Sequence, residues 1–179
     1  PVSVLPGELW HHSIMATTYY FLDTEWADVT GGELVSLALV NEGGDRLFYA
    51  ERANLPEAPT DFVRQSVYPL LDRGDAALPD AALTTELRAF LSETDAPAVM
   101  ADLPNDLQLP DDQVAACGPR PAPVMTRMSK EGLPGLLVED WFAAHPEHRA
   151  RRHHALVDAQ ALRMAWLVAT DRIPAPAWA

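Results

Sequence analysis

Residues 21–40 read FLDTEWADVTGGELVSLALV and contain the end of one predicted buried strand and all of a second. The apolar run Tyr19–Leu22 leads directly into two acidic residues, Asp23 and Glu25. An ionised carboxylate is costly to bury unless it is paired or binds a metal. The stretch therefore marks either a strand that ends in solvent, where acidic residues are ordinary, or a strand that carries carboxylates into a functional site.

The pattern around this stretch predicts alternating strands and helices. Apolar runs bounded by turn residues indicate strands, and apolar residues three and four apart indicate helices. We expect strands at residues 17–23, 33–41, 46–51, 97–103 and 123–128, and helices at 60–71, 80–92 and 154–169. The residues NEGGD (41–45) between the second and third strands are typical of a hairpin turn. This order predicts an α/β or α+β protein with a sheet packed on helices.

Composition narrows the classes of function. The 179 residues carry a formal net charge of −13, so a protein that coats duplex nucleic acid through Lys and Arg is disfavoured. Cys117 is the single cysteine, which excludes an internal disulfide and a multi-thiolate zinc site and favours a reducing cytoplasm. No apolar run is long enough for a membrane span. Residues 1–14 lack the regular spacing of apolar residues that marks a helix or a strand, and they are expected to be a leader or an expression remnant. Residues 15–179 are expected to form one domain.

Three acidic segments are candidates for a shared metal site. Asp23 and Glu25 are two apart on a predicted strand and should point to one face. Asp102 lies at the carboxyl end of the predicted fourth strand and Asp106 just after it, and Asp158 lies in the strongly apolar last helix. Oxygen ligands of this kind suit Mg²⁺ or Mn²⁺. The alternative for Asp158 is an ion pair at the surface with Arg152 or Arg163.

These segments together resemble a known family. DTE (23–25), ND (105–106) and HHALVDA (153–159) are similar, in order, to the three exonuclease motifs of the DEDDh 3′→5′ exonucleases, the proofreading-exonuclease and ribonuclease T group of the ribonuclease H-like superfamily. The resemblance spans residues 17–166 and is strongest to the small single-domain exoribonucleases of mycobacterial type. It implies a ribonuclease H-like mixed five-stranded sheet flanked by helices.

The resemblance also implies roles for individual residues. Asp23, Glu25, Asp106 and Asp158 would be the carboxylates that bind two Mg²⁺ (or Mn²⁺) ions, with Asp102 behind them. His153 would be the general base and would lie on a loop before the helix, although helical spacing alone favours His154 as the neighbour of Asp158. Substitution of His154 is expected to have a mild effect. Trp26 and Arg152 are the candidates for substrate contacts, Trp26 either by stacking on a base or, equally, as a core residue.

The implied activity is that of a metal-dependent hydrolase, a 3′→5′ exoribonuclease that releases nucleoside 5′-monophosphates from single-stranded or 3′-overhang RNA. The expected partner is the 3′ end of a single-stranded nucleic acid, with RNA favoured over DNA. No membrane association is expected, and a homodimer is left open. Three alternatives stay open: a DNA-trimming or proofreading-like exonuclease, a non-catalytic nucleic-acid-binding domain of the same fold, and an endonuclease with clustered carboxylates. The cations of the site, aided by Arg149, Arg151 and Arg152, would offset the negative charge of the chain.

Overall fold

The computed structural model describes residues 17–102, 124–127 and 133–178. These residues form one mixed sheet with the strand order β4-β3-β2-β1-β5-β6. The suggested leader, residues 1–14, and the candidate ligand Asp106 lie outside the described residues.

The sheet is antiparallel on one side of β1 and parallel on the other. β1 (Thr18–Trp26), β2 (Leu34–Asn41) and β3 (Leu47–Arg52) pair antiparallel, whereas β5 (Pro97–Ala101) is parallel to β1 and β6 (Val124–Arg127) is parallel to β5. The two-residue β4 (Ala77–Leu78) adds a short parallel edge to β3. The five predicted strands and the mixed α/β class are confirmed, and β4 was not predicted.

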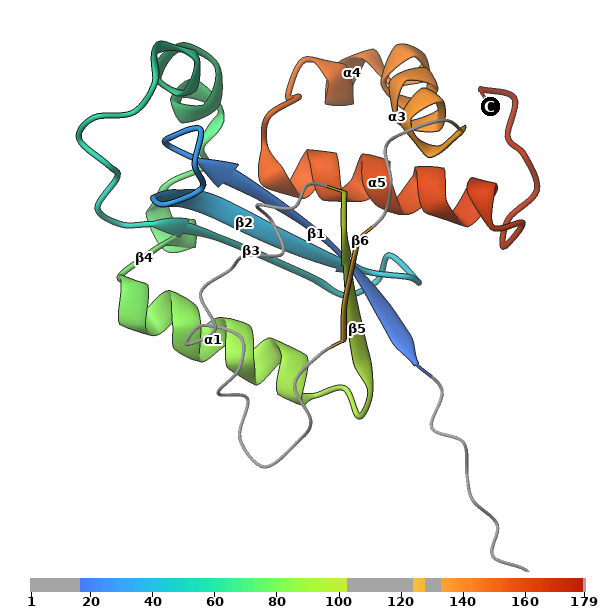
Figure 1. Cartoon of the computed structure of the whole chain (residues 1–179), viewed down its shortest axis with the longest axis horizontal. Helices are drawn as coiled ribbons and strands as arrows, with labels where there is room; N and C mark the ends of the chain where they lie inside the picture. Colours follow the sequence, from blue (N-terminus) through green and yellow to red (C-terminus); the bar gives the residue numbers. More distant parts are fainter. Residues whose placement is uncertain (1–16, 103–123, 128–132, 179) are drawn as a thin grey trace, which may run out of the picture.

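Helices cover both faces of the sheet (Figure 1). α1 (Asp80–Ser92), which has the predicted bounds, lies on one face. α5 (Ala155–Ala169) lies on the other, with α3 (Leu133–Ala144) and α4 (Pro146–Arg149) beyond it. Neither α3 nor α4 was predicted. Among the described residues, none of the helices combines the length and the apolar character that a membrane crossing requires.

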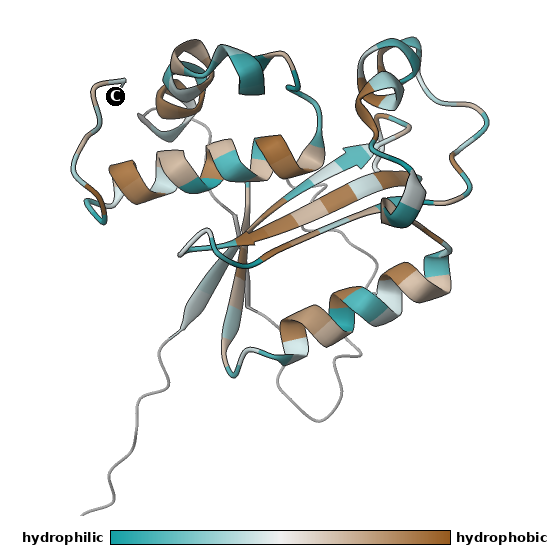
Figure 2. Ribbon diagram, turned by 180° about the vertical axis from the view of Figure 1, so that it is seen from behind, coloured by the Kyte–Doolittle hydropathy of each residue, from teal (hydrophilic) through white to brown (hydrophobic). Residues whose placement is uncertain are grey.

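The alternation of β1 divides its side chains between two cores. Tyr20 and Leu22 pack with Leu83, Leu87 and Leu91 of α1, which are four residues apart and share one helix face. Phe21 points the other way and packs with Leu162 and Trp166 of α5. Because helices cover both faces, every residue of β2 is buried, as its largely apolar sequence suggests (Figure 2).

The prediction of a regular α-helix at residues 60–71 is wrong. The segment forms a π-helical turn at Val63–Val67 and a 3₁₀ turn at Tyr68–Leu70. Its predicted cap is present, since Thr60 Oγ1 accepts a hydrogen bond from the Val63 N–H at 3.3 Å. Pro69 has no N–H to continue the helical ladder, and its ring clashes with the preceding turn, which explains the early end.

Leu87 tests the importance of the α1 face for stability. Its side chain is 1% exposed, so Leu87→Ala should lower the free energy of unfolding by about 2–5 kcal/mol, measured by denaturant titration. The exposed neighbour Glu86 provides the control, and Glu86→Ala should change it by less than about 0.5 kcal/mol. Equal effects of the two changes would contradict the packing described for α1.

Candidate functional site

The carboxyl end of β1 presents two carboxylates to the α5 side of the sheet. Asp23 and Glu25 continue the alternation of Phe21 and are both half-buried. Their partners on β2 are small: Asp23 lies opposite Ala38, and Glu25 lies opposite Ser36. The prediction that the two acidic residues share a face is confirmed, and the small partners leave room above the sheet.

Asp102, which directly follows β5, lies beside Asp23. The parallel register pairs Phe21 with Met100, so the residues two positions further on, Asp23 and Asp102, lie level with each other. Asp102 is 4% exposed and lines one pocket with Asp23 and Asp158. The carboxyl ends of two adjacent parallel strands are thus both acidic. The structure brings Asp102 into the site, whereas the placement of Asp106 lies outside the described part of the chain.

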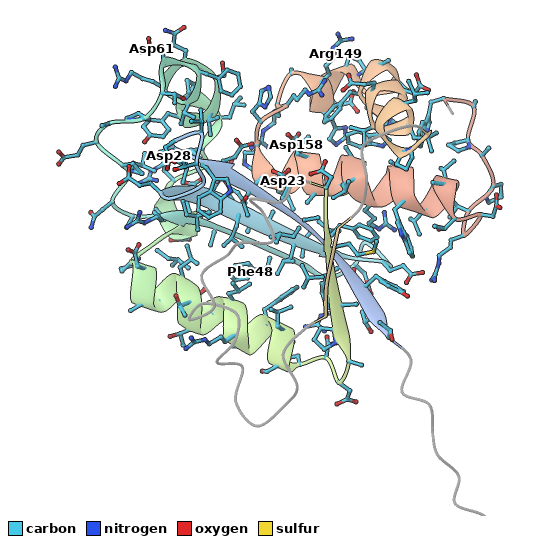
Figure 3. The ribbon with its side chains drawn as sticks, in the orientation of Figure 1. Asp23, Asp28, Phe48, Asp61, Arg149 and Asp158 are labelled. Atoms are coloured by element: carbon cyan, nitrogen blue, oxygen red, sulfur yellow. The ribbon has the colours of Figure 1, made fainter. Side chains whose placement is uncertain are left out.

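Asp158 reaches the sheet because α5 packs closely against it. Ala155 and Ala159 are both fully buried and lie in one cluster with Ala38 of β2. Methyl side chains on both sides permit a close approach of helix and strand, and Asp158 is adjacent to Ala159. Figure 3 labels Asp23 on the sheet and Asp158 on α5 at the same end of the molecule. Of the two arginines considered as partners of Asp158, Arg163 donates to the Glu42 carbonyl at 2.8 Å, whereas Arg152 lines the same pocket as Asp158, whose charge helps to raise the pKa of Arg152.

His153 precedes α5 and completes the group. Its backbone is left-handed, with φ 74°, and its N–H donates to Asp158 Oδ2 at 3.2 Å. Candidate ligand atoms of Glu25, His153 and Asp158 lie within 4.8 Å of one another. The prediction that His153 lies on the loop before the helix is confirmed, because α5 begins at Ala155. The hydrogen bond explains why a histidine five residues before the aspartate can share its site.

The neighbouring His154 points into the core. It is 1% exposed, and its ring stacks on Tyr49 with centroids 4.5 Å apart. Burial lowers the pKa of His154, and the Arg151 guanidinium acts in the same direction, which favours the neutral ring. The expectation that substitution of His154 has a mild effect on turnover stays a prediction, whereas removal of this buried ring should lower stability by leaving a cavity beside Tyr49.

Arg152 and Trp26, the two predicted substrate contacts, have different surroundings. Arg152 lines the pocket, but its guanidinium is held by both oxygens of Glu139 at 2.5 and 2.8 Å, which raises the pKa of Arg152. Arg151 is likewise paired, with Asp72. Two of the three arginines expected to offset the charge of the site are therefore already engaged by carboxylates. Trp26 packs against the α1 cluster, on the opposite side of β1 from Glu25.

Phe62 was not recognised in the sequence as a site residue. Its ring meets His153 edge-on, with centroids 4.9 Å apart, and it is 53% exposed. Single exposed apolar side chains are common on protein surfaces, so it is the contact with His153 that makes Phe62 a candidate site residue. The sequence indicates only that Phe62 lies in the first turn after the Thr60 cap. Its contact with His153, about 90 residues further along the chain, cannot be predicted from that local pattern.

The donor set suits a hard divalent cation. Carboxylate oxygens are the preferred ligands of Mg²⁺ and Mn²⁺, and a neutral imidazole is compatible with Mn²⁺. Candidate atoms of Glu25 and Asp158 lie within 4.8 Å of each other, close enough for both side chains to approach one ion, with the His153 ring beside them. Asp158 belongs both to this group and to the pocket with Asp23 and Asp102, so it could join two adjacent cation positions.

Comparison with protein-family models and with curated proteins finds no match for this chain.

Binding of Mn²⁺ tests whether the group is a metal site. Asp158→Asn keeps the shape of the side chain but removes the charge shared by both positions, so it should weaken Mn²⁺ binding about 10- to 100-fold by calorimetric titration. Asp171→Asn is the matched control, because Asp171 follows the other end of α5, about 20 Å away. Equal affinity of wild type and Asp158→Asn would contradict the assignment.

Proposed function

We propose that this protein is a metal-dependent 3′→5′ exonuclease that acts on single-stranded RNA ends and has a ribonuclease H-like fold. One observation carries the proposal: carboxylates from β1, β5 and α5 converge with His153 at one end of the sheet. Segments that are far apart in the sequence have no local reason to collect like charges, which repel one another unless a cation joins them.

The ions bound there would supply the chemistry of phosphodiester hydrolysis, since two divalent cations about 3.5–4 Å apart polarise a phosphate, activate water and stabilise a departing oxygen. Asp23, Glu25, Asp102 and Asp158 are the residues of the described chain that would hold them. Asp106 stays the second-segment ligand proposed from the resemblance. The N-terminus of α5 also points its partial positive charge into the site, which favours a phosphate.

His153 is the proposed general base. Histidine is suited to this role, because the reference pKa of an imidazole, about 6.5, allows it to accept the proton of an attacking water near neutral pH. Its ring lies beside Glu25 and Asp158, on the half-exposed side of the loop, whereas His154 is buried and turned away. The geometry thus favours His153 over His154 for a role at the scissile phosphate.

A single-stranded substrate fits the charge and the exposed surface of the site. A chain with a net charge of −13 gains little from phosphate contacts along a duplex, so binding is expected at a few unpaired nucleotides. Phe62 offers an exposed ring beside His153 on which a base could stack, and stacking of this kind tolerates any sequence. The preference for RNA rests on the resemblance to the small exoribonucleases.

Labelled oligonucleotides test the activity directly. With Mg²⁺ or Mn²⁺, single-stranded RNA labelled at its 5′ end should shorten one nucleotide at a time, and RNA labelled at its 3′ end should release labelled mononucleotide at once. Blunt duplex should resist, and EDTA should abolish the reaction. Faster trimming of DNA would indicate the DNA-specific alternative, internal cuts an endonuclease, and binding without cleavage a non-catalytic domain.

Substitution of His153 tests the assignment of the base. His153→Ala should lower kcat by about 10²- to 10⁴-fold with little change in KM, because a general base acts mainly in the transition state. His148, a half-exposed histidine of α4, provides the control, and His148→Ala should keep kcat within about twofold. A full rate for His153→Ala would exclude the proposed role.

A further inference from the structure

A buried carboxylate network lies next to the loop that carries His153. Its centre is Glu51 of β3, which is 0% exposed. Glu51 accepts hydrogen bonds from the Tyr49 hydroxyl at 2.6 Å, from the Asp72 N–H at 2.7 Å, and from the Arg73 N–H and guanidinium at 3.1–3.3 Å. A carboxylate with this many donors is well compensated in the interior. It fastens residues 72 and 73 to the sheet.

Arg73 fixes the direction of this connection. Its φ of 55° is left-handed, and its guanidinium donates to the carbonyls of Arg52 and Ala53 at 3.0 and 2.8 Å. The peptide groups on both sides of Asp72 are therefore fixed, because the N–H groups of Asp72 and Arg73 both donate to Glu51. The Asp72 carboxylate extends toward the turn that precedes α5.

Asp72 contacts residues on both sides of His153. The Arg151 guanidinium donates to Asp72 Oδ1 at 2.7 Å. His154 Nε2 lies 3.4 Å from Asp72 Oδ2, a polar contact that is long for a hydrogen bond, while its ring stacks on Tyr49. Arg151 and His154, which lie on either side of the site histidine along the chain, thus both contact one carboxylate.

His153 itself has a conformation that its neighbours must impose. A non-glycine residue with φ 74° is uncommon and persists where the surrounding structure determines it. The hydrogen bond from its N–H to Asp158 fixes one side, and the Asp72 contacts fix residues 151 and 154. This conformation separates the two adjacent histidine rings, sending one to the core and one to the carboxylates.

We propose that Asp72 is a positioning residue that holds the 151–154 turn so that the His153 ring stays beside Glu25 and Asp158. The inference rests on the proposed function for its effect on catalysis. Asp72 does not belong to the carboxylate group itself, so it acts only through the turn. Its ion pair with Arg151 is about half exposed, with side-chain exposures of 50% and 45%, and such pairs add little to global stability. Its loss should therefore appear in turnover more than in folding.

The experiment compares Asp72→Ala with Asp80→Ala. Asp80 is a matched control, because it forms a similarly exposed pair with Arg52 at 2.6 Å and lies on α1, across the sheet from the site. With Mg²⁺ and labelled RNA, Asp72→Ala should lower kcat about 10- to 100-fold with KM nearly unchanged, whereas Asp80→Ala should stay within about twofold. Asp72→Asn, which keeps an acceptor for Arg151, should recover part of the loss.

A double-mutant cycle distinguishes positioning from a separate role. In the His153→Ala background, Asp72→Ala should cost less than about twofold more, because the residue through which it acts is already gone. Independent, multiplying losses would overturn the proposal, as would a full rate in Asp72→Ala.

Proton NMR of the histidine rings supplies a readout that needs no nuclease activity. The His153 resonance, assigned as the one missing in His153→Ala, should shift or broaden in Asp72→Ala and stay in place in Asp80→Ala. An unchanged resonance in Asp72→Ala would overturn the positioning role. If the wild type cleaves no nucleic acid while the resonance responds as expected, the proposed function fails and the positioning of His153 stands.

Discussion

The close packing of α5 on β1 and β2 is the constraint on which the site depends. Ala155 and Ala159 of α5 lie in one cluster with Ala38 of β2, so methyl groups line this part of the contact between helix and sheet. A larger residue at any of these positions would push the N-terminus of α5 outward, and interiors tolerate such added volume poorly. Asp158 would then move away from Asp23 and Glu25. The small side chains therefore matter as much to the site as the charged ones do, although they take no part in its chemistry.

Gathering carboxylates at one end of the sheet has an electrostatic cost that the rest of the fold offsets. Two apolar cores, one under α1 and one under α5, hold β1 on both faces just before it reaches Asp23. The strand cannot turn its acidic end to solvent without removing Phe21 or Leu22 from these cores, where each is 0% exposed. Hydrophobic burial thus fixes a cluster that would repel itself in an unconstrained chain.

Much of the sheet and helix α1 could be predicted from the sequence. The strands β1, β2 and β3 are apolar runs bounded by turn residues, and α1 has apolar residues at helical spacing. Helix α3 escaped prediction because its first turn contains Pro134 and Gly135, a pair typical of turns, although Pro is well tolerated at a helix start. β4 is two residues long and is defined only by its partner β3. Four of the candidate site residues do lie together, namely Asp23, Glu25, His153 and Asp158. The pairing of Arg152 with Glu139 and the contact of Phe62 with His153 could not be predicted, because they join residues that are distant in the sequence.

The two adjacent histidines show why spacing rules alone could not identify the candidate base. Residues four apart share a helix face, so the rule pairs His154 with Asp158. The rule holds only inside a helix, and α5 begins one residue after His154. At His153 the chain is left-handed, which turns the two rings in different directions. His154 then stacks on Tyr49 in the interior, and His153 bonds through its own N–H to Asp158. Because the conformation of one residue decides which ring reaches the carboxylates, groups that touch only the preceding turn can control the site.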